Sequence, residues 1–117
     1  MSNLSVGKLG EKIAKKFLEG KGYKVLEKNF QTRFGEIDLV AKDGGTLVFV
    51  EVKTRYTEKF GRPEESVTPA KIRKIIKAGQ FYRNTNTNLP ELERIDVVAL
   101  ELSSDGKIKR LDLKSKT

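Results

Sequence analysis

The stretch from Gly35 to Arg55 constrains the fold of this chain most strongly. Its letters are GEIDLVAKDGGTLVFVEVKTR, two largely apolar runs joined by Asp43-Gly44-Gly45. Such a pattern is typical of an antiparallel hairpin, because glycine readily adopts the positive φ values that a two-residue turn requires. The stretch therefore predicts two strands that pair directly with each other.

A turn centred on Gly44-Gly45 fixes the register of this hairpin. It sets Asp38 opposite Glu51 and Glu36 opposite Lys53. Because side chains alternate along a strand, one face of the hairpin is wholly apolar, while the other is apolar near the turn and charged toward the open end. The residues of the apolar face are Ile37, Leu39, Ala41, Val48, Val50 and Val52. This pattern predicts a sheet covered on both sides, with a cleft over one end.

The charges inside these strands need compensation. Two carboxylates directly across a hairpin repel each other, and burying them unpaired costs several kcal/mol. Lys53 offers one positive charge against Asp38, Glu51 and Glu36, whereas a divalent cation would neutralise the pair. The spacing leaves one alternative open, which is an exposed outer face carrying ordinary surface charges.

The chain has neither cysteine nor histidine. Disulfides, thiolate or imidazole metal ligands and histidine acid–base catalysis are therefore excluded. Any metal would be a hard cation held by oxygen atoms, with Mg²⁺ as the first choice and Mn²⁺ as another suitable ion.

The remaining pattern predicts one domain over 1–117, with the element order α-β-β-β-α-β-β. Ser5 and Thr68-Pro69 are expected to begin the two helices. The inward residues of the second helix are expected to be Ile72, Ile75, Ile76, Gly79 and either Phe81 or Tyr82. The expected elements are a helix at 5–19, a strand at 23–30, a loop at 31–35, the central hairpin, a polar loop at 56–67, a helix from 68 to about 83, and a final hairpin at 95–102 and 108–113.

Glu11 lies on the first predicted helix, at the flank of its apolar stripe. Gly7 and Gly10 are small enough to let another backbone approach it. A role in a site is one interpretation. The other is a surface glutamate paired with Lys15 one turn later.

The chain is basic, with 24 lysines and arginines against 16 acids and a net charge of +8. Such a charge favours nucleic acid as a partner, although solubility alone would also explain it. The excess gathers after the central hairpin and over the second helix. Candidate phosphate contacts are Arg55, Lys71, Arg73, Lys74 and Lys77, for which a solvated helix face is the alternative.

Nothing in the sequence indicates a membrane protein. No stretch approaches the ~20 apolar residues of a membrane span, and no signal-peptide pattern opens the chain. The expected compartment is the cytoplasm.

Two motifs carry a resemblance to known nucleases. Gly35-Glu36-Ile37-Asp38-Leu39 and Phe49-Val50-Glu51-Val52-Lys53-Thr54-Arg55, with Glu11 upstream, resemble the motif of the restriction-endonuclease-like nucleases and lie close to that of archaeal Holliday-junction resolvases. The chain as a whole is similar to the small bacterial YraN family of predicted endonucleases. Further shared features are Gly10-Glu11 with Ala14, Gly22-Tyr23, Asn29, Lys71, and Arg94 with Asp96-Val97-Val98.

The resemblance implies an α/β fold with a central mixed sheet flanked by helices. It also implies that Asp38 and Glu51 bind a metal, that Lys53 assists the attacking water, and that Glu11 completes the site. The expected function is a magnesium-dependent endonuclease that acts on branched or damaged DNA. A non-catalytic nucleic-acid-binding module and a small adaptor with a structural charged cluster are the alternatives. A symmetric homodimer would suit the cutting of two strands.

Overall fold

The computed structural model describes residues 5–56 and 67–116. The elements are α1 (Val6–Gly20), β1 (Lys24–Thr32), β2 (Gly35–Asp43), β3 (Thr46–Tyr56), α2 (Pro69–Thr85), β4 (Leu92–Leu102) and β5 (Ile108–Ser115). Their order is the predicted one. The polar loop predicted at 56–67 lies outside the described residues apart from its two ends, of which Tyr56 closes β3.

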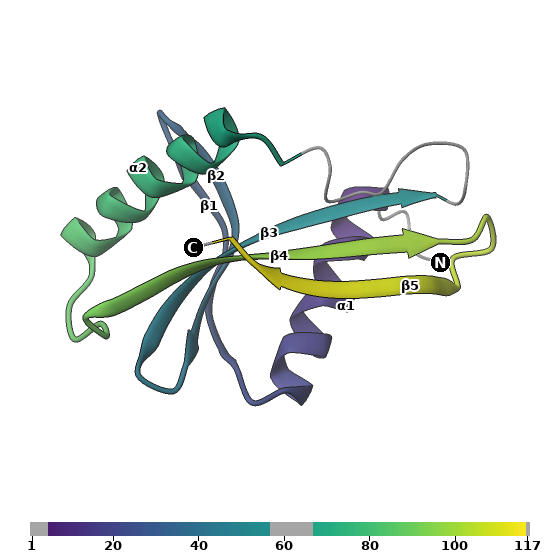
Figure 1. The fold of residues 1–117 in the computed structure, drawn as a ribbon, viewed down its shortest axis with the longest axis horizontal. Coiled ribbons are helices and arrows are strands. Elements are labelled where there is room, and N and C mark those ends of the chain that lie inside the picture. The colour runs from purple at the N-terminus through teal and green to yellow at the C-terminus, as the bar shows by residue number, and fades with distance from the viewer. Residues whose placement is uncertain (1–4, 57–66, 117) are drawn as a thin grey trace.

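The five strands form one mixed sheet in the order β1-β2-β3-β4-β5 (Figure 1). β3 and β4 are parallel, and the other neighbours are antiparallel. A parallel pair needs a long connection, and α2 lies in that crossover. The predicted α/β fold, a central mixed sheet with flanking helices, is confirmed. Neither described helix is long and apolar enough to cross a membrane.

The two helices cover opposite faces of the sheet and begin where the sequence predicts. Ser5 Oγ accepts a hydrogen bond from the amide of Lys8, and Thr68 Oγ1 accepts one from Lys71, so each helix has its N-cap. The α1-side core consists of Ala14, Leu18, Leu39, Val48, Val50 and Val98. The α2-side core consists of Ile37, Val40, Leu47, Phe49, Ile75, Ala78, Tyr82 and Ile95.

A glycine lets each helix approach the sheet closely. A Cβ at Gly79 would lie 2.5 Å from Cε2 of Phe49, and a Cβ at Gly10 would overlap the side chain of Thr54 on β3. Both helices therefore dock at positions where any other residue would push them outward.

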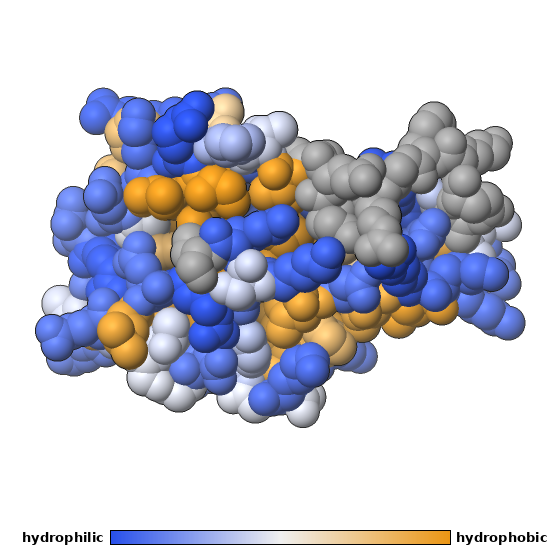
Figure 2. All heavy atoms as spheres, viewed as in Figure 1, coloured by the Kyte–Doolittle hydropathy of each residue, from blue (hydrophilic) through white to orange (hydrophobic). Residues whose placement is uncertain are grey.

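The inward face of α2 differs from the prediction at one position. Ile75, Ala78, Gly79 and Tyr82 are buried, whereas Ile76 is 37% exposed. The buried positions follow a helical stripe that leaves Ile76 on its flank, so the prediction for Ile76 was wrong. Tyr82 rather than Phe81 is the buried aromatic residue. Figure 2 shows hydrophilic atoms over the outer side of α2 and a band of hydrophobic atoms below it.

The central hairpin follows the predicted register only near its turn. The pairs run from Asp43–Thr46 to Leu39–Val50. Beyond that point β2 continues to pair with β1 as far as Gly35, and β3 continues to pair with β4 as far as Tyr56. Within the described part of the chain, the pairing of β2 with β3 ends there, so these two strands part at the open end of the hairpin.

The predicted pairs Asp38–Glu51 and Glu36–Lys53 are therefore wrong. Oδ2 of Asp38 instead accepts a hydrogen bond from the amide of Val52 at 2.8 Å, and Glu36 pairs with Gln31 of β1. Repulsion between buried carboxylates opposes a continuous ladder at this point. The parting also explains why Ile37 packs in the α2-side core rather than beside Leu39 on the predicted apolar face.

Candidate functional site

Three carboxylates converge where β2 parts from β3. Glu11 comes from α1, and Glu36 and Asp38 come from β2. Each offers an oxygen atom, and these atoms all lie within 4.8 Å of one another. A set of donors made only of carboxylate oxygens suits a hard divalent cation such as Mg²⁺ or Mn²⁺.

Asn29 ties two of these acids together. Its Nδ2 donates hydrogen bonds to Glu11 Oε1 and Glu36 Oε2, both at 2.8 Å, and its Oδ1 accepts one from Lys8 Nζ at 3.0 Å. Its φ of 50° lies in the left-handed region, which asparagine tolerates better than most residues. The sequence named Asn29 only through the family resemblance, and nothing in its pattern indicated this bridging position.

Asp38 is the most perturbed acid of the cluster. Burial, together with the negative charges of Glu51, Glu11 and Glu36, raises the pKa of Asp38 from the usual 3.8 to about 7. The hydrogen bond from Val52 opposes it. The site therefore holds more negative charge than its own residues compensate, and a divalent cation would supply the missing positive charge.

Glu51 lies beside this cluster with two lysines. Its carboxylate is buried, and Oε2 lies 3.1 Å from Lys71 Nζ and 3.5 Å from Lys53 Nζ. Lys53 is on β3 and Lys71 is in the first turn of α2. The structure thus brings Glu51 together with Lys53, the expected partner of the attacking water, and with Lys71, one of the candidate phosphate contacts.

Glu11 is not the surface glutamate of the alternative interpretation. Its partner at 3.7 Å is Lys8, while Lys15 pairs with Glu19 at 3.9 Å. Glu11 also accepts the hydrogen bond from Asn29, which connects α1 to β1. It therefore belongs to the carboxylate cluster.

Members of the carboxylate cluster line two hollows. The first, of about 320 Å³, lies beside α2 and is lined by Glu36, Asp38, Lys71 and Lys74, with Phe34 at its wall. The second, of about 420 Å³, lies beside α1 and includes Glu11 and Asn29. Five lysines line the second hollow: Lys8, Lys12, Lys15, Lys16 and Lys28. The sequence did not single out this α1 surface, because lysines along a helix usually form a solvated face.

The structure places the five predicted phosphate contacts unevenly. Lys71 and Lys74 line the α2 hollow, and Lys77 stands 5.8 Å from the centre of the Phe34 ring. Arg73 is exposed on α2, and Arg55 is half-buried on β3 opposite Glu101 of β4. Of these five residues, Lys71 and Lys74 line the α2-side hollow together with Glu36 and Asp38.

The sequence matches the model of the Uncharacterised protein family UPF0102 over residues 10–100, a range that includes all four acids of the site. The chain belongs to this family. A UPF0102 protein of Syntrophus aciditrophicus is 48% identical over 104 residues, which cover 89% of this chain and 82% of the relative. One of Syntrophomonas wolfei is 49% identical over 108 residues, covering 92% of both chains. The UPF0102 protein THEYE_A1950 of Thermodesulfovibrio yellowstonii is 45% identical over 112 residues, covering 96% of both. The predicted resemblance to the YraN family is thereby confirmed.

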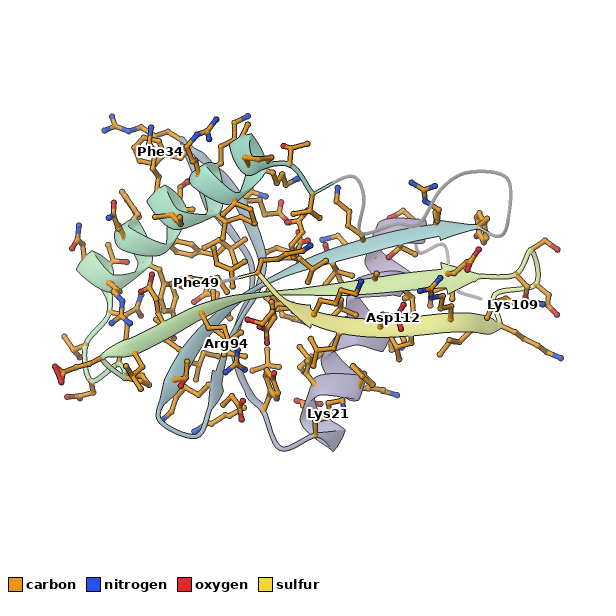
Figure 3. The ribbon with its side chains drawn as sticks, viewed as in Figure 1. Lys21, Phe34, Phe49, Arg94, Lys109 and Asp112 are labelled. Carbon is orange, nitrogen blue, oxygen red and sulfur yellow. The ribbon has the colours of Figure 1, made fainter. Side chains whose placement is uncertain are left out.

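This UPF0102 chain has a second charged cluster, built around the buried Asp96, which we call the Arg94 network. Arg94 Nε donates to Asp96 Oδ1 at 2.9 Å, and its Nη2 donates to Asp43 Oδ2 and to the Tyr23 hydroxyl, both at 2.8 Å. The Tyr23 hydroxyl in turn donates to Asp96 Oδ2. In Figure 3, Arg94 lies toward the β2–β3 turn and Phe34 lies beside the outer side of α2. The sequence carried a signal for this network, because Asp96 is an acid inside an apolar run.

Proposed function

We propose that this UPF0102 protein is a metal-dependent phosphodiesterase that acts on DNA as an endonuclease for branched or damaged substrates. One observation carries the proposal: three carboxylates from two elements converge beside a buried glutamate and two lysines. Hydrolysis of a phosphodiester in a chain without histidine calls for this combination of oxygen ligands and fixed cations.

The residues present fit a divalent cation. Glu11, Glu36 and Asp38 would hold it, and Glu51, whose charge acts on Asp38, is the other proposed ligand. When bound, such an ion lowers the pKa of a coordinated water and stabilises the negative charge that develops on the phosphate.

The lysines have separate roles in this proposal. Lys53, two residues after Glu51 on β3, orients the attacking water or stabilises the pentavalent phosphate. Lys71 reaches the same carboxylate from α2 and adds positive charge where the transition state is most negative. Lys74 lines the same hollow but does not contact Glu51. Its proposed role is to position the DNA backbone.

The surface around the carboxylates supports DNA as the substrate. Basic residues line both hollows, and the chain has a net charge of +8. Two basic hollows, each lined by members of one cluster of acids, suit a substrate whose strands part at the cleavage site. A branch or a lesion has that geometry, whereas a continuous duplex has not.

The decisive experiment measures cleavage of labelled four-way-junction and linear duplex DNA with Mg²⁺ or Mn²⁺. Wild type is compared with Asp38→Asn and Glu11→Gln, and Glu91→Gln serves as the control because it changes an exposed glutamate that lines neither of the two hollows. We expect the first two variants to cut at least about 100-fold more slowly and Glu91→Gln to match wild type. Mn²⁺ binding, followed by calorimetry, should be lost in the same two variants.

Two results would contradict the proposal. Equal cutting by wild type and Asp38→Asn would assign the activity to a contaminating nuclease. Salt-dependent DNA binding that survives Asp38→Asn, without metal-dependent cleavage by wild type, would instead identify a non-catalytic nucleic-acid-binding module.

A further inference from the structure

A third hollow, of about 360 Å³, borders the one that contains Asp38. Its lining residues are Arg33, Phe34, Lys77, Gln80, Phe81 and Asn84. Phe34 also lines the hollow with Glu36 and Asp38, so its ring stands between the two. A ligand that reached from the carboxylates past Phe34 would enter this aromatic hollow.

We propose that the aromatic hollow binds an unpaired nucleobase of the DNA, next to the phosphate at the carboxylates. This inference rests on the proposed function and names the structure that the substrate must have at the same site. The substrate would contain a single-stranded or unstacked nucleotide on the α2 side of the scissile bond.

The aromatic rings are available for stacking. Phe81 is 44% exposed on α2, although its ring is 6.3 Å from that of Phe30 at the edge of the α2-side core. Phe34 is half-buried and lies beside the outer side of α2, whereas Phe49 lies between α2 and the sheet (Figure 3). Stacking of a base on an aromatic ring contributes strongly to the binding of single strands, and it tolerates any sequence because every base has a π-face.

The charges of the hollow match a nucleotide. The guanidinium carbon of Arg33 lies 5.1 Å from the centre of the Phe34 ring, and Lys77 Nζ lies 5.8 Å from it. None of the six lining residues of this hollow is acidic. A base stacked here would have its flanking phosphates beside two cations, as in other binding sites for single strands.

The amides of the hollow can read the edge of a base. Gln80 and Asn84 are one turn apart on α2 and, with Lys77 and Phe81, form one stripe along the helix. Each amide both donates and accepts hydrogen bonds, which suits the Watson–Crick edge of a base. In a duplex that edge is already paired and both faces are stacked, so only an unpaired base fits this hollow.

Photo-crosslinking tests the inference directly. A duplex carrying one unpaired 5-iodouracil is compared with the same duplex in which that base is paired, both with wild-type protein and a chelator to prevent cleavage. We expect a crosslink, mapped by mass spectrometry, to Phe34 or Phe81 with the unpaired base only. Equal crosslinking of the paired base, or crosslinks confined to other peptides, would overturn the inference.

Binding affinity provides the second measurement. Phe34→Leu and Phe81→Leu keep the apolar volume but remove the π-face, so we expect each to weaken binding of single-stranded DNA by about 5- to 100-fold while blunt duplex binding stays the same. Ile108→Ala is the control, because it alters an exposed apolar side chain on β5, and it should leave both affinities unchanged. Equal losses for single-stranded and duplex DNA would overturn the inference.

The two proposals fail in different ways. Phe81→Leu should keep Mn²⁺ binding, whereas Asp38→Asn should lose Mn²⁺ binding and keep the crosslink. If metal-dependent cleavage occurs without a crosslink in the aromatic hollow, only the base-binding inference is wrong. If the crosslink forms but no metal-dependent cleavage is found, only the proposed phosphodiesterase activity is wrong.

Discussion

Two charged clusters beside the same sheet each contain a buried acid, and their negative charges are neutralised in different ways. In the Arg94 network, Asp96 is 2% exposed, yet both of its oxygens have partners in Arg94 and Tyr23. In the carboxylate site, Asp38 accepts a hydrogen bond from Val52 while three other acids act on it. Burial of an acid therefore does not distinguish a candidate functional site. The distinguishing feature is a buried acid whose negative charge is not paired with a cation of the protein.

The pKa shifts express this difference. The hydrogen bond from Arg94 to Asp96 is the largest of the causes that raise the pKa of Arg94, so the guanidinium stays charged. Burial and the neighbouring acids raise the pKa of Asp38 to about 7, so its carboxylate is readily protonated. The acid of the Arg94 network is thus paired with a cation of the protein itself, whereas in the proposed function the carboxylate site takes up a divalent cation.

The largest expected loss of stability comes from breaking the Arg94 network. Arg94→Met leaves Asp96 buried without its cation, so we expect the free energy of unfolding to fall by about 3–5 kcal/mol. Urea unfolding measures this loss. Arg110→Met is the control because Arg110 pairs with Asp112 at a half-exposed site on β5, and we expect a change below about 1 kcal/mol. Similar losses in both variants would mean that the Arg94 network is no stronger than a surface pair.

The next largest effect is the pH dependence of stability that the carboxylate site causes in the metal-free protein. The pKa of Asp38 is higher in the folded protein than its usual value of 3.8, so the folded state binds more protons than the unfolded state between about pH 4 and pH 7. The stability that this protonation provides is fully present below pH 4 and is lost as the pH rises to about 7, a loss of about 2–4 kcal/mol. Urea unfolding of the wild type in a chelator at several pH values measures it.

Asp38→Asn should remove most of that pH dependence and stabilise the metal-free protein at pH 8, because asparagine keeps an acceptor for the Val52 amide without the charge. The same substitution in the other cluster, Asp96→Asn, should destabilise the protein at pH 8, because it takes a charged partner from Arg94. If both substitutions changed stability in the same direction, the contrast between the clusters would be wrong.

The smallest expected effects come from changing how closely each helix packs on the sheet, and they test whether the position of α1 matters for the carboxylate site. Gly10→Ala and Gly79→Ala each place a methyl group against a neighbour, so we expect each to cost about 1–3 kcal/mol of stability. Only Gly10→Ala displaces α1 next to Glu11, so it alone should weaken Mn²⁺ binding, by about 10-fold. Calorimetry distinguishes the two variants. Equal weakening by Gly79→Ala would show that general loosening, rather than the position of Glu11, controls the site.

The sequence predicted the fold well where local rules decide it. The turn at Gly44-Gly45, the caps at Ser5 and Thr68 and the order of elements depend on nearby residues, and all are as predicted. The sequence also predicted that Asp38 pairs directly with Glu51; that pair does not form, although the charge of Glu51 still acts on Asp38. Side-chain alternation fixes which face a residue occupies, but it does not fix where a ladder between two strands ends.

The unpredicted features of the site depend on contacts between distant segments. Asn29 meets Glu11 across 18 positions of sequence, and Arg94 meets Tyr23 across 71. Because β2 parts from β3, Glu36 has no partner position on β3, and its carboxylate accepts hydrogen bonds from Asn29 and Gln31 of β1. Such contacts follow from how α1 and β4 pack against the central strands, and no single segment contains that information.

The order of the strands has a consequence for the time course of folding. Asn29, Glu36, Asp38 and Glu51 all belong to the β1–β2–β3 meander, whose strands are joined by short turns. Hairpins close within about 1–10 microseconds, whereas β4 must pair with β3 across the α2 crossover, a much slower kind of contact. We therefore expect Glu36, Asp38 and Glu51 to come together before Lys71 on α2 is in place beside Glu51. We expect protons and divalent cations to speed refolding as well as to stabilise its product.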